Sequence, residues 1–263
     1  MKAVFRFLKA WSAIVLITGP VGLFTTVLLL LGMPGTVCHR LVSRAWGKWI
    51  LRGSGIALQV RGMEQIDLRR SYVFLYNHMS YFSFFAIAAA FPLQWRGILR
   101  KELLYIPFSW VFYRAGHIFL NLRDRSRAIQ SIDKAAGCIR KGISVFIAPE
   151  GRRTGPSELA PFKNGGFILA IRAGVPVVPV TFLEDRLDTR PPWHFVPRLI
   201  QITVCEPIAT TGLSLSDKDR LKEQVRTRIL AAFEVEREAE GGVCILEQVA
   251  RFRRLPWSKA AWA

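Results

Sequence analysis

Residues 72–83 read YVFLYNHMSYFS, and residues 144–154 read SVFIAPEGRRT. Each segment begins with a short apolar run that predicts a β-strand, and each run ends in a polar cluster. The first cluster begins with Asn77-His78, and the second extends from Pro149 to Thr154. In an open α/β sheet, ligands bind at the carboxyl ends of the strands. The two clusters therefore occur where such a sheet would place its binding site.

The same alternation of short strands and longer helices continues along the chain after Gly55. The predicted strands are 56–60, 72–76, 95–99, 118–122, 144–148, 177–182 and 199–205, and the predicted helices are 82–91, 107–115, 126–141, 162–174 and 217–238. This order predicts an α/β fold with a largely parallel central sheet flanked by helices. We expect an α/β domain over 56–212, preceded by a membrane-anchoring segment over 1–55 and followed by a helix and basic tail over 213–263. The tail is interpreted equally well as a membrane contact or as a frayed end.

The composition combines strong positive charge with high hydrophobicity. The 263 residues include 37 lysines and arginines against 19 acids, a net charge of +18, and 51% of the residues are hydrophobic. Disorder needs high charge with low hydrophobicity, so it is excluded. A basic and apolar chain favours an anionic membrane surface over nucleic acid as its partner.

The N-terminal segment is the apolar part of the chain. Ala10 to Met33 carries no charge and is long enough to cross a hydrocarbon layer of about 30 Å. Gly19-Pro20 interrupts it and favours a kink or a break, so one spanning helix and a re-entrant pair both remain open. Before Glu64 there are eight basic residues and no acid, which places this end on the cytoplasmic face of the inner membrane.

A basic helix is predicted directly after the apolar segment. Its cations recur every four residues on one stripe, and apolar side chains including two tryptophans occupy much of the remaining surface. The cations are Arg40, Arg44, Lys48 and Arg52, and the apolar residues are Leu41, Val42, Trp46, Trp49 and Ile50. Such a helix lies in the headgroup layer of a membrane or packs on the domain with its charges in solvent.

His78 is the candidate general base. A histidine at a strand-to-helix turn can accept a proton near neutral pH, although a single histidine is also a common structural residue. The four cysteines and four histidines have no metal-ligand spacing, so we expect no metal and no redox cofactor.

Four ordered segments between residues 56 and 210 together resemble the glycerolipid acyltransferase family, whose best-known members acylate 1-acylglycerol 3-phosphate. The first resembles the family motif N-H-x-S-x-x-D, the third resembles E-G-T-R-S, and the fourth is its apolar, proline-containing block. They are Asn77-His78-Met79-Ser80 with Ser83; Lys101-Glu102-Leu103 leading to 116–123; Glu150-Gly151-Arg152-Arg153-Thr154 with 162–165; and 175–180. Four such segments in the family's order are a far more specific signal than any one of them.

The resemblance implies a role for each matching residue. His78 would be the catalytic base, and Lys101 and Arg153 would hold a phosphate, for which a guanidinium offers two parallel hydrogen bonds. Glu150 and Gly151 would shape the turn, with Thr154 beside them. Arg123, Arg125 and Arg127 would meet either that phosphate or an acidic donor carrier, unless they form a solvated basic face.

The chain departs from the family at two positions. Ser83 stands where the family has the aspartate that orients and charges the histidine; its hydroxyl can accept a hydrogen bond but supplies no negative charge. Another carboxylate substitutes, or the enzyme is slow, or the fold survives without catalysis; we favour retained acyl transfer, with Glu102 and Glu150 as candidate substitutes. Arg152 adds a positive charge where the family commonly has threonine, consistent with a different acceptor headgroup.

The resemblance implies a membrane-associated O-acyltransferase. It would move a fatty acyl chain from acyl carrier protein or coenzyme A to the free hydroxyl of a lysophospholipid, first of all 1-acyl-sn-glycerol 3-phosphate. Alternatives are another lysolipid, such as a lyso-ornithine lipid or an acylated sugar, and a catalytically impaired lipid-binding homologue.

Overall fold

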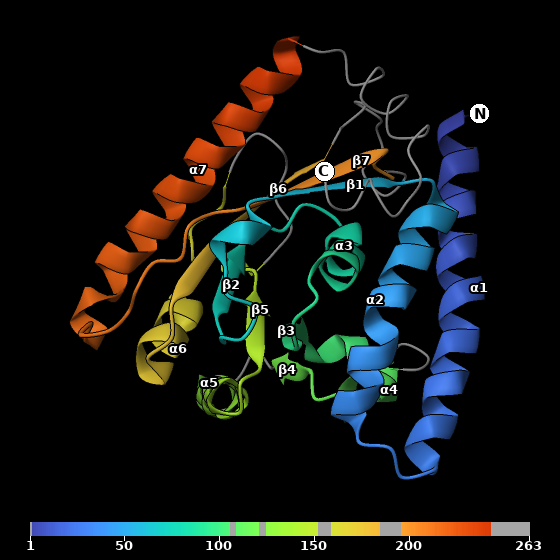
Figure 1. The fold of residues 1–263 in the computed structure, drawn as a ribbon, viewed down its shortest axis with the longest axis horizontal. Helices are drawn as coiled ribbons and strands as arrows, with labels where there is room; N and C mark the ends of the chain where they lie inside the picture. Colours follow the sequence, from blue (N-terminus) through green and yellow to red (C-terminus); the bar gives the residue numbers. More distant parts are fainter. Residues whose placement is uncertain (1, 106–108, 121–124, 152–158, 185–195, 243–263) are drawn as a thin grey trace.

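The computed structural model describes residues 2–105, 109–120, 125–151, 159–184 and 196–242 (Figure 1). Seven strands form one sheet in the order β1-β7-β6-β2-β5-β3-β4. The strands are β1 (Ala57–Arg61), β2 (Val73–Tyr76), β3 (Trp95–Arg100), β4 (Ile118–Leu120), β5 (Ser144–Ile147), β6 (Val177–Glu184) and β7 (Leu199–Val204). Only the β6–β7 pair is antiparallel. The predicted α/β fold with a largely parallel sheet is therefore confirmed, and every predicted strand is present.

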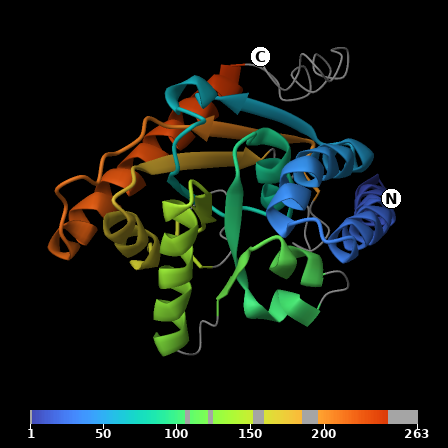
Figure 2. The same cartoon turned by 60° about the horizontal axis from the view of Figure 1, so that its bottom comes forward.

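Helices cover both faces of this sheet (Figure 2). They are α1 (Lys2–Leu30), α2 (Gly35–Ser54), α3 (Phe82–Ala90), α4 (Ser109–Arg114), α5 (Arg125–Arg140), α6 (Gly165–Ala173) and α7 (Lys218–Gly242), and the short 3-10 helices are Met63–Gln65, Lys101–Tyr105 and Leu215–Asp217. Because successive side chains of a strand point to opposite faces, the core has two halves. One half packs against α2 and α3, and the other packs against α5, α6 and α7.

The central strands show this alternation directly. Phe74 of β2 and Phe146 of β5 stack on the α3 face, with ring centroids 4.3 Å apart, whereas Val73 and Val145 belong to the opposite half of the core. All of these side chains are buried. Burial on both faces is the usual environment of parallel strands, and it fixes the position of the loops that follow them.

The apolar N-terminal segment forms one helix that is continuous through Gly19 and Pro20. Of the alternatives of one helix and a pair broken at Gly19-Pro20, the structure has the one helix: α1 runs on to Leu30, turns, and returns as α2, so that the two helices lie side by side (Figure 1). Pro20 has no backbone N–H, so α1 lacks one hydrogen bond there. This loss is tolerated because α1 packs along its length on α2. Residues Val4–Leu30 are long and apolar enough to cross a membrane.

Helix α2 combines the two interpretations of the basic segment. Trp46 and Ile50 are buried in the core rather than at a membrane surface, so the domain holds this face of the helix. Trp49, Leu41 and Arg40 are exposed on its other side. The helix therefore packs on the domain and still presents tryptophan beside positive charge to its surroundings.

Candidate active site

The adjacent strands β6, β2 and β5 are parallel to one another, so their carboxyl ends meet at one edge of the sheet. His78 follows β2, Glu150 follows β5, and Glu184 is the last residue of β6. The two polar clusters of the sequence therefore come together around the central strand, as expected from their places after predicted strands. Glu184 joins them from a position that no motif indicated.

Glu150 supports the loop that carries the histidine. Its Oε1 accepts the backbone N–H of His78 at 3.1 Å, and its Oε2 accepts the backbone N–H of Ala160 at 3.1 Å. The carboxylate is only 3% exposed, and burial together with its charge raises the pKa of the neighbouring Tyr76 hydroxyl. Hydrogen bonds to a charged acceptor are stronger than neutral ones, so Glu150 ties two loops together at this edge.

Asn77 fixes the other side of the same loop. Its side-chain amide donates to the carbonyl of Phe182 at 2.9 Å and accepts the N–H of the same residue at 2.7 Å. The last main-chain partners of β2 and β6 are Tyr76 and Val180, so the amide adds one more rung to this ladder with a side chain. The residue that precedes His78 is thus attached to β6 by two hydrogen bonds.

Ser80, Ser83 and Glu184 form a small buried network beyond the histidine. The Ser80 hydroxyl donates to Glu184 Oε1 at 2.6 Å and accepts the N–H of Phe82 at 3.0 Å. Ser83, which is fully buried in the first turn of α3, accepts the N–H of Ser80 at 3.4 Å. The predicted catalytic Ser83 therefore shapes the turn between His78 and α3.

The ring of His78 lies at the rim of this edge. The residue is half-buried, its Nδ1 is inaccessible to solvent, and its ring meets the edge of the Tyr76 ring at 5.9 Å between centroids. Because the pKa of Tyr76 is raised, its hydroxyl stays neutral beside the imidazole. One side of the ring is thus held by the protein while the residue keeps access to solvent, as a proton acceptor requires.

A glycine and a lysine lie beside Glu150. Gly151 has φ +67°, a left-handed conformation that favours glycine, and a Cβ there would lie 2.8 Å from the Nζ of Lys163. The Lys163 N–H also donates to the carbonyl of Pro149 at 2.8 Å, which fixes the start of this lysine side chain over the turn. Lys163 is exposed. It belongs to the third motif and adds a cation beside Gly151 that the sequence did not indicate as a site residue.

The remaining predicted residues divide into two groups. Lys101 is exposed at the carboxyl end of β3, next to β5, and Glu102 is exposed and pairs with Arg100 at 3.9 Å. Four predicted substrate-binding residues lie outside the described part of the chain: Arg123, Arg152, Arg153 and Thr154. The side chains of Arg125 and Arg127 also lie outside it.

Known proteins are similar to this chain over most of its α/β domain. Residues 57–183 match the protein family described as Acyltransferase. The 1-acyl-sn-glycerol-3-phosphate acyltransferase of Pseudomonas aeruginosa is 31% identical over 65% of this chain and 68% of that protein. The alpha enzyme of the same description from Homo sapiens is 29% identical over 72% of this chain and 68% of its own length. The chain belongs to the acyltransferase family.

The fold of this acyltransferase is also that of a solved structure. The crystal structure of the 1-acyl-sn-glycerophosphate (LPA) acyltransferase from Thermotoga maritima superposes with a TM-score of 0.70, at 23% identity, over 89% of this chain and 95% of that one. The sequence relatives confirm the family that the four motifs resemble and its assignment as an O-acyltransferase, and this structure confirms the fold.

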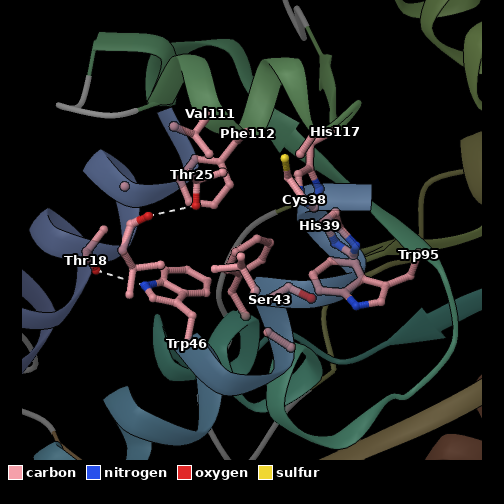
Figure 3. A pocket seen from close by; sticks show the side chains of 16 residues that line it. Thr18, Thr25, Cys38, His39, Ser43, Trp46, Trp95, Val111, Phe112 and His117 are labelled. Carbon is pink, nitrogen blue, oxygen red and sulfur yellow. Dashed lines mark hydrogen bonds between the residues drawn. The ribbon is translucent and has the colours of Figure 1, made fainter. Parts of the chain in front are cut away.

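The acyltransferase also has a partly open apolar pocket of about 60 Å³ between α1, α2, α3 and α4 (Figure 3). Its walls include Trp46, whose indole N–H donates to Thr18 at 3.1 Å, and Phe84 of α3. His39 and His117 line one end. Burial, then the positive charge of Arg96, lowers the pKa of His39 to about 3, and the pKa of His117 is lowered mainly by burial.

These two histidines are consequently neutral parts of the packing. His117 Nδ1 accepts the N–H of Gly97 at 2.9 Å, and the ring centroids of both histidines lie within 5.3 Å of each other and of Trp95. A nitrogen that accepts a backbone N–H has no lone pair left for a substrate proton. Neither histidine lies at the carboxyl edge of the sheet, which leaves His78 as the candidate base in the described part of the acyltransferase.

Proposed function

We propose that the protein is a membrane-associated acyltransferase that transfers a fatty acyl chain from acyl carrier protein or coenzyme A to the free hydroxyl of 1-acyl-sn-glycerol 3-phosphate. The observation that carries the proposal is the position of His78 at the carboxyl edge of the central strand. There it is held from β5 through Glu150 and from β6 through Asn77. Such double support is what a proton acceptor of fixed geometry needs.

The chemistry is one acyl transfer. The lipid hydroxyl attacks the thioester carbonyl while the imidazole of His78 takes its proton. The new ester bond forms, the carbon–sulfur bond breaks, and the departing thiolate receives a proton as the thiol is released. Because the base must point at the hydroxyl throughout, support of its main chain by Glu150 contributes directly to the rate.

The cations at the same edge suit an anionic headgroup. Lys101 is exposed at the end of β3, and Lys163 is exposed beside Gly151 after β5. The family resemblance adds Arg153, Arg152, Arg123 and Thr154, with Gly151 allowing close approach of the backbone. Lysine and arginine together would hold the phosphate of the acceptor while its hydroxyl faces His78.

Anchoring to the membrane follows from the exposed surface of α1. Val15 is 66% exposed and Leu16 is 71% exposed, and other large apolar residues of this helix are exposed with them. An apolar surface of this extent is unfavourable in water and marks a binding face. We propose that residues 1–55 hold the domain at the cytoplasmic face of the inner membrane, where lysolipid is available. Replacing both Val15 and Leu16 by glutamate should release the protein from sedimented membranes.

Release of free thiol from an acyl thioester tests the activity. The wild-type protein, in detergent or vesicles, should release thiol only when 1-acylglycerol 3-phosphate is added. His78→Ala should lower that rate by about 10²- to 10⁴-fold, whereas Lys134→Ala, an exposed change on α5, should not alter it. Equal rates for wild type and His78→Ala would refute the histidine mechanism.

Other acceptors and loss of activity are distinguished by the same assay. Thiol release with a lyso-ornithine lipid or an acylated sugar in place of the phosphate lipid would identify a different headgroup, as Arg152 suggests. Lipid binding without thiol release from any acceptor would indicate the impaired homologue that Ser83 suggests.

A further inference from the structure

We propose that Glu184 supplies the negative charge that Ser83 lacks, and that it acts on His78 as a positioning residue through Ser80. This inference rests on the proposed function, because it concerns the base of the same reaction. The carboxylate would stabilise the imidazolium that forms as the lipid hydroxyl loses its proton.

The first argument is the position of Glu184. It ends β6, directly beside β2, and its Oε1 accepts the Ser80 hydroxyl at 2.6 Å. Ser80 is two residues after His78. Two residues of chain span at most about 7 Å, and the side chains add to this span, so the separation of the carboxylate from the imidazole is on the order of 10 Å. The Asn77 amide binds Phe182, which also lies on β6. His78 therefore lies between two residues, Asn77 and Ser80, that are both hydrogen-bonded to this strand.

The second argument is the state of the carboxyl group. Glu184 is only 3% exposed, and a hydroxyl-to-oxygen distance of 2.6 Å is the length of a hydrogen bond to an ionised carboxylate. Burying a carboxylate is costly, and a glutamine would hold the Ser80 hydroxyl without that cost. A buried charge at the reacting edge therefore suggests an electrostatic role beyond holding the loop.

The third argument concerns the other candidates. The Glu150 oxygens receive the main-chain N–H groups of His78 and Ala160, and Glu102 is exposed and pairs with Arg100. Ser83 accepts the N–H of Ser80, so it takes part in the same turn as the Ser80–Glu184 pair. The family has this negative charge at the position of Ser83 in α3, whereas in this chain it is on Glu184, the last residue of β6.

A double-mutant cycle tests the proposal. At an effective dielectric of about 20, a charge about 10 Å from the imidazolium changes the rate by about 15-fold. Glu184→Gln should therefore lower kcat by about 15-fold with little change in KM. In a Ser83→Asp background the same change should cost no more than about 3-fold, because the aspartate then supplies the charge. An equal loss of kcat in both backgrounds would show that Glu184 only holds the loop.

The pH profile gives a second readout that loop support alone would not move. A nearby negative charge raises the pKa of an imidazole, so Glu184→Gln should move the acidic limb of kcat/KM to lower pH by about one unit. Among the described residues, Glu150 accepts the His78 N–H, Tyr76 contacts the His78 ring and Glu184 ends the adjacent strand β6, whereas α3 carries no charged residue. An unmoved limb would overturn the proposal.

The conservative variant keeps the proposal falsifiable if the glutamine variant does not fold. Glu184→Asp keeps the charge but is too short for the 2.6 Å contact with Ser80. It should retain the wild-type pH profile and at least a third of kcat, whereas a purely structural role predicts a large loss of kcat with no recovery in Ser83→Asp. Absence of transfer by the wild type would instead refute the proposed function, so the two failures are distinguishable.

Discussion

Replacing Asn77 by alanine tests the support of the active-site loop from β6. Asn77 is 3% exposed, and its amide makes two hydrogen bonds to the backbone of the fully buried Phe182. Asn77→Ala removes both bonds and leaves a buried N–H and a buried C=O of Phe182 without these partners. Each lost bond costs about 0.5–1.5 kcal/mol, and each unsatisfied buried group costs about 1–3 kcal/mol in total.

The expected loss of unfolding free energy is therefore about 2–6 kcal/mol. For a chain of this size, that corresponds to a fall in Tm of about 4–24 °C. Turnover per folded molecule should fall as well, because His78 is the next residue and loses one of its two supports. Thermal unfolding in detergent and thiol release at a temperature well below both midpoints measure the two effects separately.

Asn164→Ala is the matched control. The Asn164 side chain is half-buried and accepts one hydrogen bond, from Lys222 at 3.1 Å. Its removal should cost no more than about 1 kcal/mol. If the two alanine variants lost equal stability, or if Asn77→Ala kept full turnover, the reasoning about the side-chain rung would be wrong.

Three further changes address neighbouring parts of the molecule. Glu150→Gln should lower kcat by about 10- to 100-fold, because it weakens charge-assisted hydrogen bonds worth about 1.5–3 kcal/mol; an unchanged kcat would contradict its supporting role. Gly151→Ala should cost about 1 kcal/mol through its φ of +67° and raise KM for the phosphate lipid by displacing Lys163, and steady-state kinetics will show whether KM changes. His39 has a folded pKa of about 3, below the unfolded value of 6.5, so stability is greatest above pH 6.5 and falls at lower pH by up to about 1.4 kcal/mol per unit. His39→Phe should make this dependence shallower, with His117 contributing the remainder; unfolding midpoints from pH 7 to 5 that fall equally in both proteins would refute it.

The strands and the family were predictable because their signals are local. A short apolar run followed by a polar cluster is visible along the chain, and burial of Val73 and Phe74 on opposite faces follows from the geometry of a strand. The motif around His78 is likewise contiguous. Gly19-Pro20 left one helix and a broken pair both open, and the fold has the one helix, since packing of α1 on α2 outweighs a local preference.

The sequence by itself determined the seven strands, the basic and apolar character of the N-terminal segment, and the prediction that His78 is the base, because each depends on neighbouring residues. Only the tertiary structure decided the carboxylates. Glu150 and Glu184 are 72 and 106 residues from His78 along the chain, and no spacing relates them to it. They reach the same loop because β5, β2 and β6 are adjacent and parallel, an order that hydrogen bonding between distant strands sets.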